Sequence, residues 1–255
     1  MRSIAAKKTE AGEERLARPA VSVVIPTLNE EAELPLALAR LRRAGRPGGV
    51  EIVVADGGST DRTLVAARAG AHKVVKSSAG RAVQMHAGAL AAAGDIILFL
   101  HADTRLPPDW LGALSAAWAS DPRPGATAFR LGFDSDEPIY RLISSLGNWR
   151  SRQTGVPHGD QGIACRREDY LLVGGFPPVA LMEEYYLLPK LSRLGALVFI
   201  DAPVRTSVRR YERNGPFLNA LRNASLIALF KAGVPPEVLG GLYRSGCSII
   251  GGNDA

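Results

Sequence analysis

The stretch DIILFLHADT, residues 95–104, decides the fold of this chain. Its apolar run, residues 96–100, is too short for a buried helix and too apolar for an exposed strand. Such a run predicts the central strand of a parallel sheet that is covered on both faces. His101 and Asp103 follow at the carboxyl end of that strand. Because residues two apart on a strand project to the same side, we expect both side chains to reach one point.

The carboxyl end of such a strand is where open α/β sheets bind their ligands. A carboxylate there suits a hard divalent cation, and such a cation suits a diphosphate, so Asp103 and His101 are candidate metal ligands. The structural alternative is that Asp103 caps the following turn and that His101 packs in the core. A short motif stays a hypothesis until its surroundings favour one interpretation.

The composition is that of an ordinary globular protein of 255 residues, with 46% apolar and 22% charged residues, which is enough for one large α/β domain or two small ones. No apolar run approaches the length of a membrane span, and none lies near the start. We therefore expect neither a transmembrane segment nor a secretory signal. Residues 1–19 mix charges without periodicity and predict a disordered tail.

The charges and cysteines narrow the class of partner and the compartment. The formal charge of +6 suits a polyanionic ligand or a membrane surface, but it is spread along the chain and does not indicate nucleic acid. Cys165 and Cys247 are far apart and in no paired motif. We expect free thiols and hence a cytoplasmic protein.

Strands alternate with helices over residues 20–105, which predicts βαβ units and a parallel sheet. We expect strands at 21–25, 51–55, 73–76 and 96–100, and a first helix that is capped by Asn29. Since parallel strands end at one edge of a sheet, one crevice should collect the polar residues at those ends. They are Asn29, Glu30, Asp56, Arg81, His101 and Asp103.

The loop DGGSTD, residues 56–61, is a second candidate element. Asp56 ends a strand and could accept hydrogen bonds from a base or a ribose, while Gly57 lets the backbone approach a flat ring. The alternative is a plain turn with a helix cap, which is the commoner meaning of these residues. The chain has no G-x-G-x-x-G after its first strand and no G-x-x-x-x-G-K-[ST], so both of these phosphate-binding motifs are missing.

Residues 106–245 predict a mixed α+β half on the same sheet, and no linker or repeat divides it from residues 20–105. We therefore expect one domain over residues 20–245, with a nucleotide-binding half and an acceptor-side half. The expected strands are 125–133, 163–165, 197–200 and 204–211, and the expected helices are 138–152, 167–172, 181–195, 217–231 and 235–243. The last two helices are assigned to the core or to a dimer surface.

Three of these segments together resemble a known family. VVIPTLNEE (residues 23–31), DGGSTD (56–61) and the aspartate after the fourth strand are similar, in order and spacing, to family-two glycosyltransferases of the GT-A fold. HADT (101–104), GDQG (159–162), MEE (182–184) and SVRRY (207–211) resemble a bacterial subgroup that is associated with arsenosugar-type biosynthesis. The resemblance implies a mixed central sheet with helices on both faces and a parallel, Rossmann-like N-terminal half.

The resemblance also implies roles for individual residues. Asp103 matches the last acid of a D-x-D motif that binds Mg²⁺ or Mn²⁺ on the diphosphate, and His101 replaces the first acid, which favours a softer ion. Glu184 matches the catalytic base, where the pattern more often has Asp, and Glu183 is the rival base. Nucleotide contacts are implied for Pro26, Asn29, Glu30, Asp56, Gly57, Arg81, Arg209 and Arg210. Acceptor contacts are expected from His158, Asp160 and Gln161.

Each of these residues also has a structural explanation. Glu183 and Glu184 could serve simply to stabilise a helix dipole, Arg209 and Arg210 could form a solvated edge, and Asp160 could simply shape a turn.

Tyr211 stands where processive relatives have Trp, and the preceding Gln is absent, so we expect a single transfer.

The functional hypothesis is an inverting, metal-dependent glycosyltransferase that moves a sugar from a nucleotide donor, UDP-linked, to a small-molecule or lipid hydroxyl. The alternatives are a sugar-nucleotide nucleotidyltransferase and a catalytically silent nucleotide-binding module. A homodimer is left open.

Overall fold

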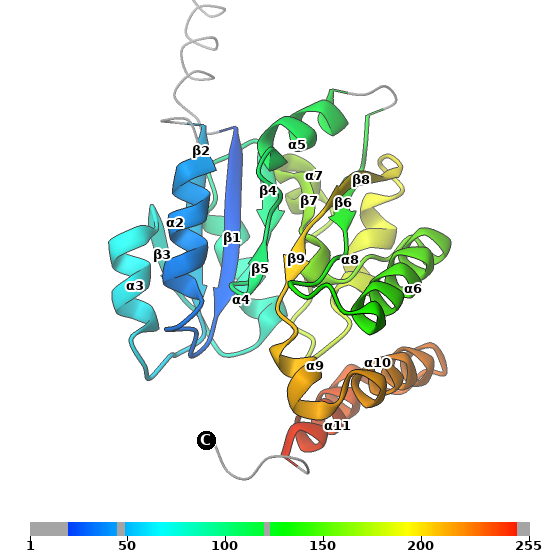
Figure 1. Cartoon of the computed structure of the whole chain (residues 1–255). Coiled ribbons are helices and arrows are strands. Elements are labelled where there is room, and N and C mark those ends of the chain that lie inside the picture. The colour runs from blue at the N-terminus through cyan, green and yellow to red at the C-terminus, as the bar shows by residue number, and fades with distance from the viewer. Residues whose placement is uncertain (1–19, 45–48, 120–122, 249–255) are drawn as a thin grey trace, which may run out of the picture.

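Strand β4 (Ile96–Phe99) is the middle strand of a seven-stranded sheet in the order β3-β2-β1-β4-β7-β6-β8 (Figure 1). The computed structural model describes residues 20–44, 49–119 and 123–248. The tail expected over residues 1–19 lies outside the described residues. The quoted stretch therefore lies at the centre of the molecule, as its apolar run predicts.

The N-terminal half is a parallel sheet, as expected from its alternating elements. Strands β1 (Val21–Thr27), β2 (Val50–Asp56), β3 (Lys73–Lys76) and β4 are parallel to their neighbours in this half. The intervening helices are α2 (Leu34–Ala44), α3 (Thr63–Gly70) and α4 (Arg81–Ala91). Every residue of β2 is buried, because helices cover the sheet on both sides.

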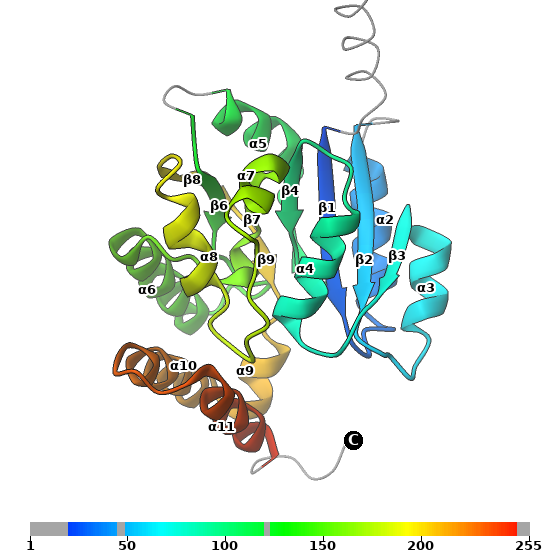
Figure 2. The same cartoon turned by 180° about the vertical axis from the view of Figure 1, so that it is seen from behind.

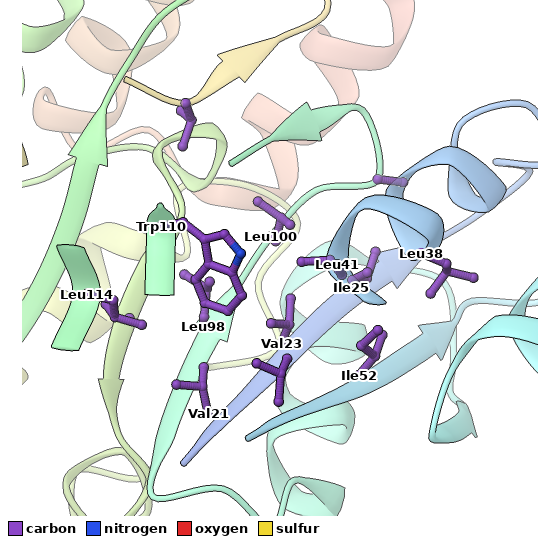
Figure 3. Close-up of a cluster of buried hydrophobic side chains, with 14 of the residues drawn as sticks. Val21, Val23, Ile25, Leu38, Leu41, Ile52, Leu98, Leu100, Trp110 and Leu114 are labelled. Atoms are coloured by element: carbon purple, nitrogen blue, oxygen red, sulfur yellow. The ribbon is translucent and has the colours of Figure 1, made fainter. Parts of the chain in front are cut away.

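Alternate residues of the strands divide the core into two layers. Val23 of β1 and Leu98 of β4 pack with Trp110 and with α2 on one face, as Figure 3 shows. Val24 packs on the other face with α4, in a second cluster that includes Met85. Helices α4, α7 (Arg167–Leu172) and α8 (Glu184–Leu191) cover this second face (Figure 2).

The second half adds antiparallel strands to the sheet. Strand β7 (Ile163–Arg166) runs antiparallel to β4 and to β6 (Ala126–Arg130), and β8 (Leu197–Pro203) runs parallel to β6. A separate two-stranded sheet joins β5 (Thr104–Arg105) to β9 (Arg205–Thr206). The remaining elements are α5 (Trp110–Trp118), α6 (Pro138–Thr154), the 3₁₀ turn η1 (Gly159–Gln161), α9 (Arg209–Asn214), α10 (Pro216–Lys231) and α11 (Pro236–Ser248). The sheet is mixed and covered on both faces, which confirms the predicted fold class.

Three local predictions are wrong. Strand β4 ends at Phe99, so His101 and Asp103 lie in a turn, where the N–H of Thr104 donates to the carbonyl of His101 (3.1 Å), and not on a strand. Asn29 does not cap α2, because its φ is +55° and the helix begins at Leu34. Residues 209–211 belong to helix α9, because the chain turns after β9 and cannot continue a strand.

Two further observations concern the cysteines and the membrane. Cys165 is buried as a free thiol, and the side chain of Cys247 lies outside the described residues. Within the described ranges, no helix combines the length and the apolar character that crossing a membrane requires.

Candidate active site

A cavity of about 280 Å³ opens beyond the carboxyl ends of β1 and β4. The first turns of α4 and α8, the β4–β5 turn, η1, the β9–α9 connection and helices α10 and α11 all contribute to its walls. Among the predicted site residues, Pro26, Glu30, Arg81, His101, Asp103, His158, Asp160, Glu183 and Glu184 line it. Asn29, Asp56, Gly57, Gln161 and Arg209 do not.

The two loops after β1 and β2 are joined by reciprocal hydrogen bonds. Backbone N–H groups of residues 29–31 donate to side-chain oxygens of the second loop: Asn29 to Ser59 (2.9 Å), Glu30 to Thr63 (2.7 Å) and Glu31 to Asp61 (3.1 Å). In return, Asn29 Oδ1 accepts the N–H of Thr60 (2.9 Å), and Glu31 Oε2 accepts that of Arg62 (3.0 Å). These bonds satisfy backbone donors that no helix or strand uses, and they hold this wall of the cavity in place.

Asp56 organises its own turn. Its carboxylate accepts the N–H groups of Gly58 and Ser59 (both 3.0 Å) and the hydroxyls of Ser59 and Thr27, and the residue is only 1% exposed. Burial raises the pKa of Asp56, but these hydrogen bonds outweigh it and leave the pKa below its usual value. In this arrangement both carboxylate oxygens are occupied, which matches the turn-and-cap alternative.

Asp103 and Asp160 place two carboxylates at the cavity. Burial raises the pKa of Asp160, and the charge of Asp103 also raises it, although the charges of Arg150 and Arg81 oppose this shift. Oδ1 of Asp160 is buried without a hydrogen-bond partner among the described residues. Both groups line the cavity beside His101, and that ring lies against Gly159, where an added Cβ would be 2.8 Å from its Nε2.

This donor set fits a hard divalent cation in part. Mg²⁺ commonly binds through one or two carboxylates and takes its other ligands from substrate phosphates and water. Two repelling carboxylates, one with an unsatisfied oxygen, suit that pattern. Within the described ranges, no group of three or more His, Cys, Asp or Glu side chains could hold a metal by itself. A diphosphate would therefore have to complete the coordination.

Glu183 and Glu184 are buried at the start of α8, 2% and 5% exposed. Glu184 Oε1 accepts the N–H of Gly159 (2.8 Å), and Arg81 Nε lies 3.8 Å from Glu183 Oε1. Burial, together with the charge of Glu183, raises the pKa of Glu184 to about 8, although Arg81 opposes this. Burial disfavours the charge of Arg81, yet the two carboxylates outweigh it and raise the pKa of the guanidinium.

His158 and Gln161 have different surroundings although they are three residues apart. His158 lines the cavity and contacts the guanidinium of Arg150, and burial with the charges of Arg150 and Arg81 lowers its pKa to about 3. The imidazole is therefore neutral at physiological pH. Gln161 is 1% exposed, accepts a hydrogen bond from the hydroxyl of Ser151 (2.8 Å) and donates one to the carbonyl of Phe129 (3.1 Å). These bonds connect η1 to α6 and β6 on the side away from the cavity lining.

The arginines of SVRRY are not gathered at the cavity. Arg209 is 57% exposed in its side chain and forms an ion pair with Glu33 (3.3 Å). The side chain of Arg210 lies outside what the structure describes. Tyr211 does line the cavity.

Sequence reasoning missed residues that α4, α10 and α11 contribute. Asn219, Asn223 and Tyr243 line the cavity, and Gln84 ties the ends of β1 and β2 by donating to the carbonyls of Thr27 and Ala55. One signal was available: Asn219 and Asn223 are four apart in a largely apolar helix, so they share one face.

Comparisons with known proteins identify the family. A model described as "Glycosyl transferase family 2" matches residues 22–172. A PGL/p-HBAD biosynthesis glycosyltransferase of Mycobacterium bovis is 33% identical over 182 residues, 59% of this chain and 71% of that protein.

Other curated relatives match over shorter stretches. An uncharacterised glycosyltransferase of Mycobacterium tuberculosis is 45% identical over 89 residues, and an undecaprenyl-phosphate 4-deoxy-4-formamido-L-arabinose transferase of Pseudomonas paraeruginosa is 41% identical over 166. These matches cover 34% and 57% of this chain, but only 38% and 46% of the relatives' own length.

Solved structures show the same fold. Glucosyl-3-phosphoglycerate synthase from Mycobacterium tuberculosis, in complex with Mn²⁺, UDP and glucosyl-3-phosphoglycerate, superposes with a TM-score of 0.59 at 23% identity, over 89% of this chain and 84% of that one. S. aureus TarS superposes with a TM-score of 0.59 at 18% identity, over 86% and 41%. The cavity at the carboxyl edge, the GT-A architecture and the matching family model together establish that this chain belongs to glycosyl transferase family 2.

Proposed function

We propose that this glycosyltransferase moves a sugar from a nucleotide-sugar donor, UDP-linked, to a hydroxyl of a small-molecule or lipid acceptor, with inversion and with a divalent metal ion. The observation that carries the proposal is the buried pair Glu183 and Glu184 in the same cavity as Asp103 and Asp160. Proton transfer and metal-assisted diphosphate binding need separate carboxylates in one cavity. This cavity contains a buried pair for the first and a second pair for the other.

Glu184 is proposed as the base that takes the proton from the attacking hydroxyl. The N–H of Gly159 holds its Oε1, which fixes the orientation of the carboxylate. Its raised pKa makes it a stronger base than an ordinary glutamate once it is ionised. One base and one in-line attack give inversion at the anomeric carbon.

The leaving diphosphate is assigned to the side of the cavity that is lined by Asp103 and Asp160. A Mg²⁺ or Mn²⁺ ion held by Asp103, with Asp160 and His101 beside it, would neutralise charge on the diphosphate. Arg81 is the arginine among the described lining residues, and its position beside Glu183 keeps its charge in the cavity. The mycobacterial synthase with Mn²⁺ and UDP supports this choice of donor and metal by fold alone.

The acceptor group is proposed to be an uncharged hydroxyl. The described lining contains Glu30, Asp103, Asp160, Glu183 and Glu184 but a single Lys or Arg, which is Arg81. A second anion beside these carboxylates would be repelled, whereas a neutral hydroxyl would not. The likeness to a subgroup associated with arsenosugar-type biosynthesis stays a prediction about the acceptor.

Calorimetric titration with UDP, in the presence and absence of Mn²⁺, tests the proposal. We expect Mn²⁺ to strengthen UDP binding to the wild type and to have almost no effect on UDP binding to Asp103→Ala. The UDP affinity in the presence of Mn²⁺ should therefore be about 100-fold lower in the variant, a loss comparable to those seen when a metal site is disrupted. The matched control is Asp136→Ala, which removes an exposed carboxylate outside the cavity. If Mn²⁺ strengthens UDP binding equally in Asp103→Ala and in the wild type, Asp103 is not a metal ligand.

Family membership favours transfer over the two alternatives. A nucleotidyltransferase would need a glycine-rich, basic loop after β1, and residues 27–31 are acidic instead. A silent binding module would bind UDP-sugar without ever cleaving it. Slow, Mn²⁺-dependent hydrolysis of UDP-sugar therefore argues against the silent module, and a panel of UDP-, GDP- and dTDP-sugars in thermal-shift assays identifies the nucleotide.

A further inference from the structure

Helix α6 exposes a stripe of large apolar side chains. Leu142, Leu146 and Trp149 are 55%, 58% and 64% exposed. Their spacing of four and three residues places them on one side of the helix. Scattered apolar residues are normal on a surface, but a continuous stripe on one helix marks a place where another surface binds.

Helix α10 exposes a second group of large apolar side chains. Phe217, Leu218 and Leu221, in its first two turns, are 71%, 59% and 53% exposed. Helix α10 contacts α6, and in both views the two helices lie next to each other at the carboxyl edge of the sheet (Figures 1 and 2). We name these six side chains, Leu142, Leu146, Trp149, Phe217, Leu218 and Leu221, the docking face.

The helices that carry the docking face have an excess of basic residues. Residues 209–248 contain six basic and two acidic residues, a net charge of +4 out of +6 for the whole chain. Helices α6 and α10 contain five basic residues and no acidic residue. Arg141 of α6 and Lys231 of α10 are exposed.

We propose that the docking face binds an anionic lipid surface, with α6 and α10 lying in the plane of the membrane interface. Apolar side chains that are flanked by Lys and Arg are the composition of helices that bind this way. A second copy of the chain fits less well, because a two-fold interface would place the basic helices of one copy against those of the other.

The docking face and the cavity share helix α10. Asn219 and Asn223 of α10 line the cavity, while Phe217, Leu218 and Leu221 of the same helix are exposed. Docking would thus bring the α10 side of the cavity to the membrane interface, where a lipid-linked hydroxyl could enter. The binding itself does not depend on the proposed transfer chemistry.

Trp149 makes the binding directly measurable. Trp110 is 2% exposed and Trp118 is partly buried against the core, so a change in exposed indole fluorescence reports mainly on Trp149. We expect a blue shift, and co-sedimentation of the protein, with vesicles of phosphatidylglycerol and phosphatidylcholine in equal parts. Pure phosphatidylcholine vesicles should bind at least 10-fold less, and added salt should weaken the anionic binding.

A variant pair shows whether the docking face is responsible. The double substitution Leu146→Ser and Phe217→Ser should lower the affinity for anionic vesicles about 10-fold or more. Leu172→Ser is the matched control, because Leu172 is 73% exposed on α7, outside the docking face. Circular dichroism and UDP titration on the same preparations show whether the variants are folded.

Three outcomes would overturn the proposal. The first is no vesicle binding by the wild type, and the second is equal binding to anionic and neutral vesicles. The third is a wild-type dimer that persists when vesicles are added but dissociates in the double variant Leu146→Ser and Phe217→Ser. No nucleotide sugar is present in these experiments. Failure here with intact UDP binding would therefore leave the proposed function standing.

Discussion

The loops after β1 and β2, which lie beside the cavity, and the cavity wall formed by η1 and α8 use their carboxylates in opposite ways. On the side of β1 and β2, Asp56 and Asp61 accept several hydrogen bonds each, and the pKa of both is below the usual value because these bonds outweigh burial. On the side of η1 and α8, burial raises the pKa of Asp160 and Glu184. One oxygen of Glu183 and one of Asp160 have no hydrogen-bond partner among the described residues.

This difference separates carboxylates that build the fold from carboxylates that are available for chemistry. A satisfied carboxylate stabilises its loop and has little left to offer a ligand. A buried, poorly satisfied carboxylate costs stability, and such groups are found where function requires them. Substitutions on the first side should therefore act on stability, and those on the second side on turnover.

The largest effect is expected for Glu184→Gln. Gln keeps an oxygen that can accept the N–H of Gly159 but cannot take a proton, so turnover of UDP-sugar should fall about 10²- to 10⁴-fold while UDP affinity stays the same. Steady-state kinetics and calorimetry measure the two quantities. Retained turnover would move the base to Glu183 or elsewhere.

Glu184 also predicts opposite pH dependences for turnover and stability. Its pKa in the folded protein is about 8, against 4.5 when unfolded. The stability that the neutral carboxyl contributes is fully present below pH 4.5 and is lost as the pH rises through 8. Turnover should rise over that range, because the base must be ionised. Urea unfolding of Glu184→Gln should lack the loss of stability that the wild type shows as the pH rises from about 4.5 to about 8, the interval between the unfolded and the folded pKa.

Asp56→Asn is expected to destabilise the fold by about 2 kcal/mol at pH 7, because one of two hydrogen-bonded charged oxygens is lost. The pKa of Asp56 is lowered, so its contribution is present above the unfolded pKa of 3.8 and disappears as the pH falls through the folded one. Urea unfolding at neutral and acidic pH measures this, with Asp136→Asn as the exposed control. A stable variant that loses UDP binding would instead place Asp56 at the nucleotide.

Gly159→Ala should lower turnover about 10-fold, roughly the effect of displacing a catalytic group slightly. The added Cβ would lie 2.8 Å from His101 Nε2 and 3.0 Å from Glu184 Oε1, so both side chains must shift. Gly241→Ala is the control, because an added Cβ there has open space. Turnover equal to that of the control would mean that the geometry around Glu184 tolerates this shift.

The smallest effect is expected for Asn29→Gly, and comparison with Asn29→Ala separates the lost hydrogen bonds from backbone strain. Asn29→Gly keeps the φ of +55° accessible and removes the hydrogen bonds that Oδ1 accepts from the N–H and the hydroxyl of Thr60, at a cost of about 1 kcal/mol. Asn29→Ala adds the left-handed strain of about 1–2 kcal/mol. Thermal unfolding should rank the wild type, Gly and Ala in that order. Equal stability of the two variants would show that strain is relieved locally.

The core and its layers could be predicted from local sequence patterns. The apolar runs of β1, β2 and β4 and the helical stripe of Leu34, Leu38 and Leu41 are local patterns, and burying them leaves few alternatives to a covered, mainly parallel sheet. Topology also places polar residues at the strand ends: Asp103, His101 and Arg81 of the predicted set line one cavity, whereas Asn29 and Asp56 do not.

The surroundings of each polar residue depend on contacts that local sequence patterns do not specify. Whether a carboxylate is satisfied depends on donors that come from distant segments, such as Thr27 for Asp56 and Gly159 for Glu184. Arg209 pairs with Glu33 and does not line the cavity, although its neighbours Ser207 and Tyr211 do, and Asn219 of α10 lines it from a distant segment of the chain. Side-chain periodicity identifies what is buried, but hydrogen-bond partners and charge neighbours are set by contacts between segments far apart in sequence.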